Sequence, residues 1–173
     1  MQMSRQLLAA VLAFLLLTLA ACRKESETRG VLETVATLAR LAEQKDIEAF
    51  LAAIDDDYSD FEGRDKAGLR SLLGVYFAGR TGIVVHRLGA RVKFPEPARA
   101  ALQTEVALSS GAAEALRRLV KISPDLYRLE VELIRAPDRW LVRYAEWRAV
   151  GVTEVLPESL GPLKVLLPNL ISE

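Results

Sequence analysis

Residues 84–94, with the sequence VVHRLGARVKF, mark a change in the spacing of apolar residues along the chain. Alternate positions share one side of an extended backbone, and here they are Val84, His86, Leu88, Ala90, Val92 and Phe94. Arg87, Arg91 and Lys93 occupy the other side. Alternation of this kind is typical of a strand with one buried and one solvated face. The stretch predicts a β-strand and divides the chain into a helical part and a part made of strands.

Three amphipathic helices are predicted before this strand. Apolar residues recur at helical spacing in residues 31–42, 47–54 and 69–77. Asp46 and Asp65 precede the second and third of these segments, where an N-cap is expected. The third helix should end before Gly79.

Three further strands are predicted after residues 84–94. Residues 102–108, 127–133 and 139–150 show the same alternation, whereas 111–122 fit either a loop or a short helix. Glu105, Glu130 and Glu132 are expected on solvated faces. Helices followed by a run of strands predict an α+β domain, with the N-terminal helices packed on a curved antiparallel sheet.

Four segments of residues 31–150 together resemble a known superfamily. They are the sequence Asp46-Ile-Glu-Ala-Phe-Leu, the sequence Asp57-Tyr-Ser-Asp60, the leucine-rich third helix, and the strand that contains Arg139-Trp-Leu-Val142. The pattern is similar to the NTF2-like (cystatin-like) superfamily, and closest to its uncharacterised lipoprotein branch. The resemblance implies a cone with a cavity between helices and sheet, which different members use for catalysis, ligand binding or dimerisation. Such a fold does not by itself give the function.

The first 22 residues have the three parts of a secretory signal peptide. Arg5 lies in a polar start, residues 7–21 are apolar apart from one threonine, and small residues precede Cys22. The sequence Leu19-Ala20-Ala21-Cys22 resembles the lipobox of bacterial lipoproteins, and the only cysteine of the chain stands where that motif requires it. The alternative is an ordinary signal peptide or an uncleaved anchor.

The lipobox resemblance implies cleavage before Cys22 and a diacylglyceryl group on its thiol. Two or more acyl chains give lasting membrane attachment. Arg23, rather than an aspartate, follows the cysteine. For a Gram-negative source this implies the outer membrane, with the domain facing the periplasm. The expected location is therefore the cell envelope.

These observations divide the chain into four segments. Residues 1–21 form the signal peptide, and 22–30 comprise the lipidated cysteine with a charged tether that is expected to be flexible. Residues 31–150 form the NTF2-like domain. Residues 151–173 form a tail whose three prolines allow at most a short helix.

The composition excludes several kinds of partner and site. The 23 basic and 23 acidic residues balance, so no nucleic-acid partner is expected. One cysteine and one histidine exclude internal disulfides, cysteine-rich zinc sites and multi-histidine metal centres. The acidic run 55–62 matches a calcium loop only in part, and a solvated loop with capping roles is the preferred interpretation. We expect neither metal nor cofactor.

Five side chains are candidates for lining the cavity: Tyr58, Tyr76, His86, Trp140 and Tyr144. His86 would titrate near neutral pH, and an aromatic residue can orient a ligand with its polar end. For His86 and for the aromatic residues of the third helix and last strand, a role in packing is the preferred interpretation. Because no acid–base pair is identifiable, no catalytic residue is assigned.

The sequence favours a non-enzymatic lipoprotein, anchored to the membrane through Cys22, that binds a small apolar ligand or an envelope protein. Two alternatives stay open. One is a cavity enzyme of the proton-transfer type in which His86 works with a carboxylate. The other is a structural adaptor that forms a homodimer through its sheet.

Overall fold

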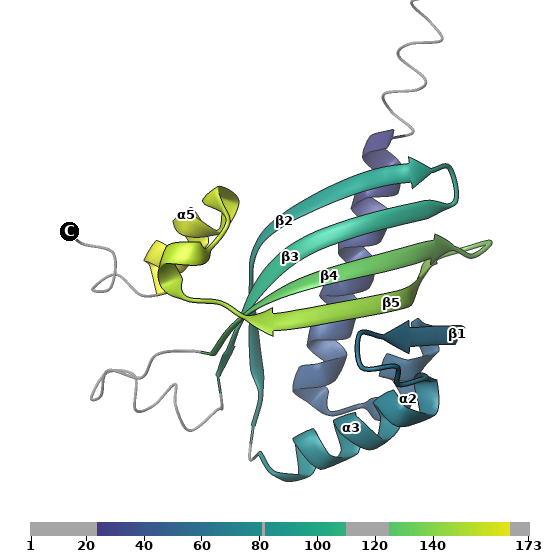
Figure 1. Cartoon of the computed structure of the whole chain (residues 1–173), viewed down its shortest axis with the longest axis horizontal. Helices are drawn as coiled ribbons and strands as arrows, with labels where there is room; N and C mark the ends of the chain where they lie inside the picture. The colour runs from purple at the N-terminus through teal and green to yellow at the C-terminus, as the bar shows by residue number, and fades with distance from the viewer. Residues whose placement is uncertain (1–23, 81, 110–124, 167–173) are drawn as a thin grey trace, which may run out of the picture.

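The computed structural model describes residues 24–80, 82–109 and 125–166. A first helix over residues 24–44 is followed by α2 (Ile47–Ala52), β1 (Ile54–Asp60) and α3 (Lys66–Ala78) (Figure 1). The strands β2 (Val84–Glu96), β3 (Arg99–Ser109), β4 (Asp125–Arg135) and β5 (Trp140–Ala149) come next, and then the short η1 (Val152–Glu154) and α5 (Pro157–Leu166). The predicted α+β class is confirmed.

The five strands form one curved sheet in the order β1-β5-β4-β3-β2. Strands β2 to β5 are antiparallel neighbours, as predicted. The strand β1 runs parallel to β5, with Ile54 opposite Val142 and Asp60 opposite Ala145. The sheet is therefore mixed, whereas the sequence predicted a purely antiparallel one.

The acidic run that contains β1 was expected to be a helix end and a loop, and this expectation was wrong. Aspartates disfavour strands, so propensity points away from this structure. Arg143 offsets the cost, since its Nη1 lies 2.7 Å from Asp55 Oδ1 and 2.8 Å from Asp57 Oδ2. Ile54 and Tyr58 from the same strand are buried in the core. Contacts distant in sequence therefore make this segment a strand.

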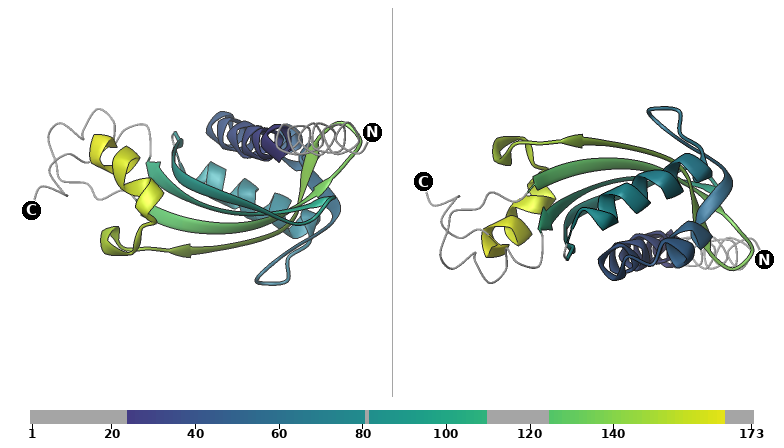
Figure 2. Two further views of the ribbon diagram at one scale, coloured as in Figure 1. Left: turned by 90° about the horizontal axis from the view of Figure 1, so that it is seen from above. Right: turned by 90° about the horizontal axis from the view of Figure 1, so that it is seen from below.

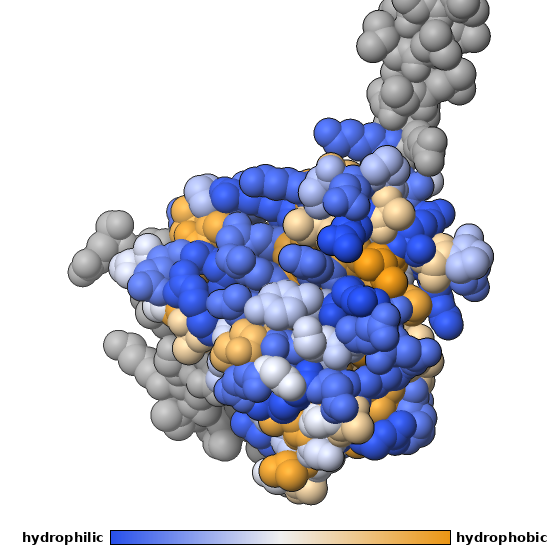
Figure 3. All heavy atoms as spheres, turned by 45° about the vertical axis from the view of Figure 1, so that its right-hand side comes forward, coloured by the Kyte–Doolittle hydropathy of each residue, from blue (hydrophilic) through white to orange (hydrophobic). Residues whose placement is uncertain are grey.

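The first helix, α2 and α3 pack on one face of the sheet, which we call the helix face (Figure 2). Its core contains buried residues from these helices, from β1 and from β3, β4 and β5. They are Val31, Leu51, Ile54, Tyr58, Leu69, Ala100, Leu102, Val131, Leu133, Trp140 and Val142. The surface seen in Figure 3 is mostly hydrophilic and carries only small apolar patches. Among the described residues, no helix is long and apolar enough to cross a membrane.

The first helix begins earlier than the sequence predicted. Residues 24–30, expected to be a flexible tether, are helical and continue without a break into residues 31–44. Gly30 lets the helix approach the sheet, because a Cβ there would lie 3.2 Å from Trp140 Cδ1. Glu27 forms an ion pair with Arg135 of the sheet. These tertiary contacts order a segment whose composition alone is that of a linker.

Both predicted N-caps are confirmed. The Asp46 carboxylate accepts a hydrogen bond from the Ala49 amide at 3.0 Å, and that of Asp65 accepts one from the Gly68 amide at 2.8 Å. The helix α2 ends at Ala52, two residues earlier than predicted, and α3 ends before Gly79 as predicted.

A β-bulge divides the strand with which the sequence analysis began. His86 and Arg87 pair with Ala107 and Val106, but the next pair is Ala90 with Thr104, so β2 holds one extra residue in between. Such an insertion shifts the alternation of side chains by one position. After the bulge, Val92 pairs with Leu102 on the helix face.

The bulge overturns the prediction that residues 84–94 have one apolar face. Leu88 packs beneath α5 with Ala107, on the opposite side of the sheet, which we call the outer face. Val92 and Phe94 pack on the helix face. Gly89, at the bulge, donates its N–H to Ser159 Oγ at 2.9 Å, and its carbonyl accepts from Thr104 Oγ1 at 2.9 Å.

The C-terminal segment covers part of the outer face. Leu163 of α5 is fully buried beside Leu126 and Val150. The Glu105 carboxylate, expected in solvent, is only 1% exposed, because η1 and the start of α5 lie over it. It accepts hydrogen bonds from the Leu156 amide at 2.9 Å and from Arg128 Nη2 at 2.6 Å. Residues 152–166 thus form a layer packed on the sheet.

Candidate functional site

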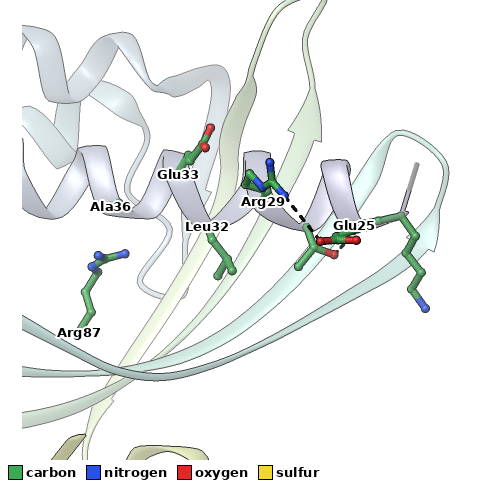
Figure 4. A pocket seen from close by; sticks show the side chains of 8 residues that line it. Glu25, Arg29, Leu32, Glu33, Ala36 and Arg87 are labelled. Atoms are coloured by element: carbon green, nitrogen blue, oxygen red, sulfur yellow. Dashed lines mark hydrogen bonds and ion pairs between the residues drawn. The ribbon is translucent and has the colours of Figure 1, made fainter. Parts of the chain in front are cut away.

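A groove of about 720 Å³ runs between the first helix and β2 (Figure 4). We call it the helix groove. Seven of its lining residues lie along one side of the first helix, and the eighth comes from β2. They are Lys24, Glu25, Thr28, Arg29, Leu32, Glu33, Ala36 and Arg87. Most of the surface inside the groove belongs to carbon atoms. It is an open hollow on the surface, and not the enclosed cavity that the NTF2-like resemblance implies.

Arg87 reaches the helix groove because of the bulge. Its cross-strand partner Val106 is on the helix side of β3, so Arg87 shares that side. Figure 4 shows the side chain rising from β2 toward Ala36 of the helix. The sequence analysis had assigned Arg87 to a solvated face. Gly89 was the missed signal, since a glycine inside a strand pattern often marks a bulge.

The charges of the helix groove are incompletely neutralised. Arg29 Nη2 lies 3.6 Å from Glu25 Oε1, and both side chains are well exposed, so this ion pair contributes little. Glu33 points away from the sheet in Figure 4. Within the part of the chain that the structure describes, Arg87 has no ion pair or side-chain hydrogen bond. Arg87 and Lys24 are therefore cations without an ion pair among the described residues, beside the apolar surface of Leu32 and Ala36.

The five aromatic and histidine candidates do not surround one space. Tyr58 and Trp140 are packed in the core of the helix face, 4% and 2% exposed. Tyr76 lies on α3 with the Arg80 guanidinium 3.6 Å from its ring centroid. His86 and Tyr144 are on the outer face, because they pair with Ala107 and Glu132. None of the five is among the residues that line the helix groove.

Tyr144 borders a second hollow, of about 530 Å³, at the far end of the outer face. The polar residues there include Ser59, Glu96, Arg99, Glu132 and Arg143. Partial burial, together with the carboxylates of Glu146 and Glu132, raises the pKa of Tyr144. Its phenol is therefore a hydrogen-bond donor at neutral pH and not a base.

The buried polar groups of the helix face have structural roles. The Asp60 carboxylate accepts from the Glu62 and Arg64 amides, each at 2.9 Å, and from Arg64 Nε at 2.7 Å. Burial, reinforced by the charge of Asp60, raises the pKa of Tyr58, which stays neutral. Trp140 Nε1 is buried with no hydrogen-bond partner among the described residues. None of these groups is a free base.

One sequence-based prediction cannot be placed on the structure. Cys22, the predicted lipidation site, lies outside the described residues. Among the residues that the structure describes, no group of three or more histidine, cysteine, aspartate or glutamate side chains is arranged to hold a metal ion.

Several solved protein structures are similar to the structure of this chain. No family model and no curated protein matches it. An NTF2-like protein with a cystatin-like fold from Novosphingobium aromaticivorans is 15% identical, with a TM-score of 0.59 over 83% of this chain and 93% of that one. A putative dehydratase of the NTF2-like family from Streptomyces avermitilis is 12% identical, with a TM-score of 0.61 over 74% and 99%.

A third solved structure is longer than this chain. Bd1075 of Bdellovibrio bacteriovorus is 14% identical, with a TM-score of 0.59 over 72% of this chain, which spans only 41% of that protein. Identities this low establish similarity of fold and nothing about activity.

Proposed function

Because the chain has the NTF2-like fold that these structures share, we propose that it is a lipid-anchored protein of the bacterial cell envelope that binds a small molecule in the helix groove and catalyses no reaction. The proposal has two parts, an anchor and a binding site. They are supported by different observations and can be tested separately.

The proposal that the chain binds a small molecule rests on the composition of the helix groove. Ligand sites combine a mostly apolar lining with a few polar groups that orient the ligand. Leu32 and Ala36 supply apolar surface, and Arg87 and Lys24 supply charges without an ion pair among the described residues. A groove lined in this way favours an amphiphilic ligand over a purely polar one.

The anchor part rests on the lipobox-like sequence that ends at Cys22. The first helix extends to residue 24 at least, so little chain separates the domain from the proposed lipid. The domain would then stand close to the membrane surface.

The structure weighs against the proton-transfer enzyme. That function needs His86 and a carboxylate to converge in the interior, but His86 pairs with Ala107 on the outer face. On the helix face, the Asp60 carboxylate is already engaged by three donors. His86 is therefore not placed to act on a molecule in the helix groove.

The outer face is also poorly suited to the adaptor that dimerises through a dry sheet surface. Glu130 stands directly opposite Glu146. Burying such charges against a second copy would cost desolvation energy, and like charges already repel across the strands. Small-molecule binding therefore remains the better proposal.

The anchor is tested by expressing the full chain in a Gram-negative host supplied with an alkynyl fatty acid. We expect the label on the wild-type chain and none on a Cys22→Ser variant, with the labelled chain in the membrane fraction. Equal labelling of both chains, or none of the wild type, would show that Cys22 is not lipidated.

The binding site is tested by identifying what co-purifies with the full chain. Ala36→Trp places a large side chain inside the helix groove, and Thr37→Trp places the same side chain on the exposed side of the same helix. We expect one compound, detected by mass spectrometry of the extracted protein, with the wild type and Thr37→Trp only. The same compound with Ala36→Trp, or none with the wild type, would contradict the proposal.

A further inference from the structure

The charges of the domain are distributed unevenly along the first helix. One end, which we call the basic end, consists of the start of that helix and of the two hairpin turns with their flanks, that is, residues 24–29, 93–99 and 135–139 (Figure 1). Glu27 is ion-paired with Arg135, whose amide donates to the Ala98 carbonyl at 2.9 Å. These contacts hold the three segments together.

The basic end carries a net positive charge. It contains six basic and four acidic side chains, which gives a net charge of +2. The acidic side chains other than Asp138 are each paired with an arginine of the same end. Lys24, Lys93 and Arg139 form no ion pair within the described residues, and all three are exposed. The charge that is not compensated is therefore positive and lies at the surface.

An acidic segment lies toward the opposite end of the same helix. Residues 46–65 come next in the chain and belong to α2, β1 and the loop before α3, at the bottom of Figure 1. They contain eight acidic side chains and one basic one. Even when Lys66, Arg70 and Arg143, which pair with four of the eight, are counted with them, the net charge is −4. The helix over residues 24–44 that separates the two charges is about 30 Å long.

The basic end is also the end nearest the proposed anchor. Lys24 is two residues from Cys22, and two residues span at most about 7 Å. A membrane surface that contains anionic phospholipid has a negative potential, which acts over about 8 Å at physiological ionic strength. When the basic end faces the membrane, its positive charges lie within this range and most of the acidic segment lies beyond it. A domain lying on its side would bring the acidic segment to the same surface, which would repel it.

We propose that the basic end docks on anionic phospholipid head groups, so that the first helix stands up from the membrane and the acidic segment faces the surrounding solution. This inference rests on the proposed function, whose anchor keeps the domain at the membrane, and it adds an interaction surface and an orientation. Two net positive charges at an anionic surface favour the docked orientation about thirtyfold. Head groups in a fluid bilayer need no pocket, so exposed lysine and arginine side chains are sufficient for this contact.

The test uses the lipidated full chain in nanodiscs that contain a phospholipid with a nitroxide on its head group. Because Cys22 is the only cysteine and its thiol is blocked by the lipid, a fluorophore can be attached to one introduced cysteine. Ala98→Cys places the fluorophore on the basic end, and Ser71→Cys places it on the exposed side of α3. Nanodiscs of phosphatidylcholine with phosphatidylglycerol are compared with nanodiscs of phosphatidylcholine alone.

Two double variants separate docking from an effect of total charge. Lys93→Glu with Arg139→Glu changes the net charge of the basic end from +2 to −2. Arg40→Glu with Lys164→Glu changes the total charge by the same amount at exposed positions outside the basic end. Circular dichroism confirms that each variant is folded, and mass spectrometry confirms the lipid on Cys22.

We expect the nitroxide to quench the fluorophore at position 98 more strongly when phosphatidylglycerol is present, and high salt to remove the difference. The fluorophore at position 71 should be quenched weakly in both kinds of nanodisc. The double variant of the basic end should lose the response to phosphatidylglycerol, whereas the control double variant should keep it.

Two results would overturn the inference in distinguishable ways. If mass spectrometry finds no lipid on Cys22, the anchor is wrong, and the docking that depends on it is wrong as well. If the lipidated chain is quenched equally at position 98 in both kinds of nanodisc, or if the two double variants reduce quenching equally, the anchor stands and the basic end is not a docking surface.

Discussion

The buried carboxylate of Glu105 should be a large contributor to the stability of the domain. It accepts from Arg128 Nε at 2.9 Å, from Arg128 Nη2 at 2.6 Å and from the Leu156 amide at 2.9 Å. One side chain therefore connects β3, β4 and the segment that leads into α5. Replacing Glu105 by alanine removes all three hydrogen bonds at once.

The expected cost follows from what the substitution leaves unpaired. The Arg128 side chain is only 13% exposed, and stranding a buried charge costs about 3–5 kcal/mol. Because Arg128 keeps a hydrogen bond to the Glu154 carbonyl, the lower end of that range applies. The orphaned Leu156 amide adds about 1 kcal/mol. The sum is about 4 kcal/mol, which lowers Tm by about 8–16 °C in a domain of this size.

Thermal unfolding of the full chain in detergent, followed by circular dichroism, measures this effect. Glu130→Ala is the matched control, since Glu130 is on the neighbouring strand of the same face, is exposed, and accepts one hydrogen bond from Gln103. The control should change stability by no more than about 0.5 kcal/mol. Equal shifts in Tm for the two variants would refute the argument that Glu105 holds the C-terminal segment.

Three other predictions concern single positions. Gly89→Ala places a Cβ 2.7 Å from Ser159 Oγ, so α5 should detach and trypsin should cleave after Lys164 faster than in the wild type; unchanged cleavage would argue against this contact. Asp65→Ala removes the cap of α3 and should lower the free energy of unfolding by about 1 kcal/mol in urea denaturation, and no change would mean that the cap is dispensable. Burial raises the pKa of Tyr58 in the folded state, so at high pH the unfolded state loses a phenol proton that the folded state keeps. This contribution to the free energy of unfolding is therefore complete below a pH of about 10 and decreases above it. Urea midpoints measured across that range should fall less steeply for Tyr58→Phe, and parallel curves would contradict the assignment.

The helices and the fold class could be predicted from the sequence because their signals are local. Helical spacing identified three helices, and Asp46 and Asp65 marked two of their starts, since a cap needs only the amide three residues later. Two-residue alternation identified the four antiparallel strands. The sequence also limited the site chemistry, because one histidine and one cysteine leave few catalytic or metal centres to consider.

Tertiary contacts decided the features on which the candidate site depends. The acidic β1 is a strand because Arg143, far away in sequence, neutralises two of its aspartates. Residues 24–30 are helical because they lie against the sheet at Trp140 and Arg135. In each case the local composition predicted a loop or linker, and the contacts that make the segment regular come from another helix or strand.

The bulge in β2 is the clearest feature that the sequence could not predict. The sequence alone gave His86 and Val92 the same face and Arg87 the opposite one, because alternation assumes an unbroken strand. One extra residue before Ala90 leaves Arg87 on the side of the helix groove and His86 on the outer face. Where that residue is inserted depends on the partners of Gly89, namely Thr104 on the next strand and Ser159 in α5. The sequence determined most of the helices and strands. Pairing in three dimensions decided β1, the start of the first helix, and which side chains meet in the groove.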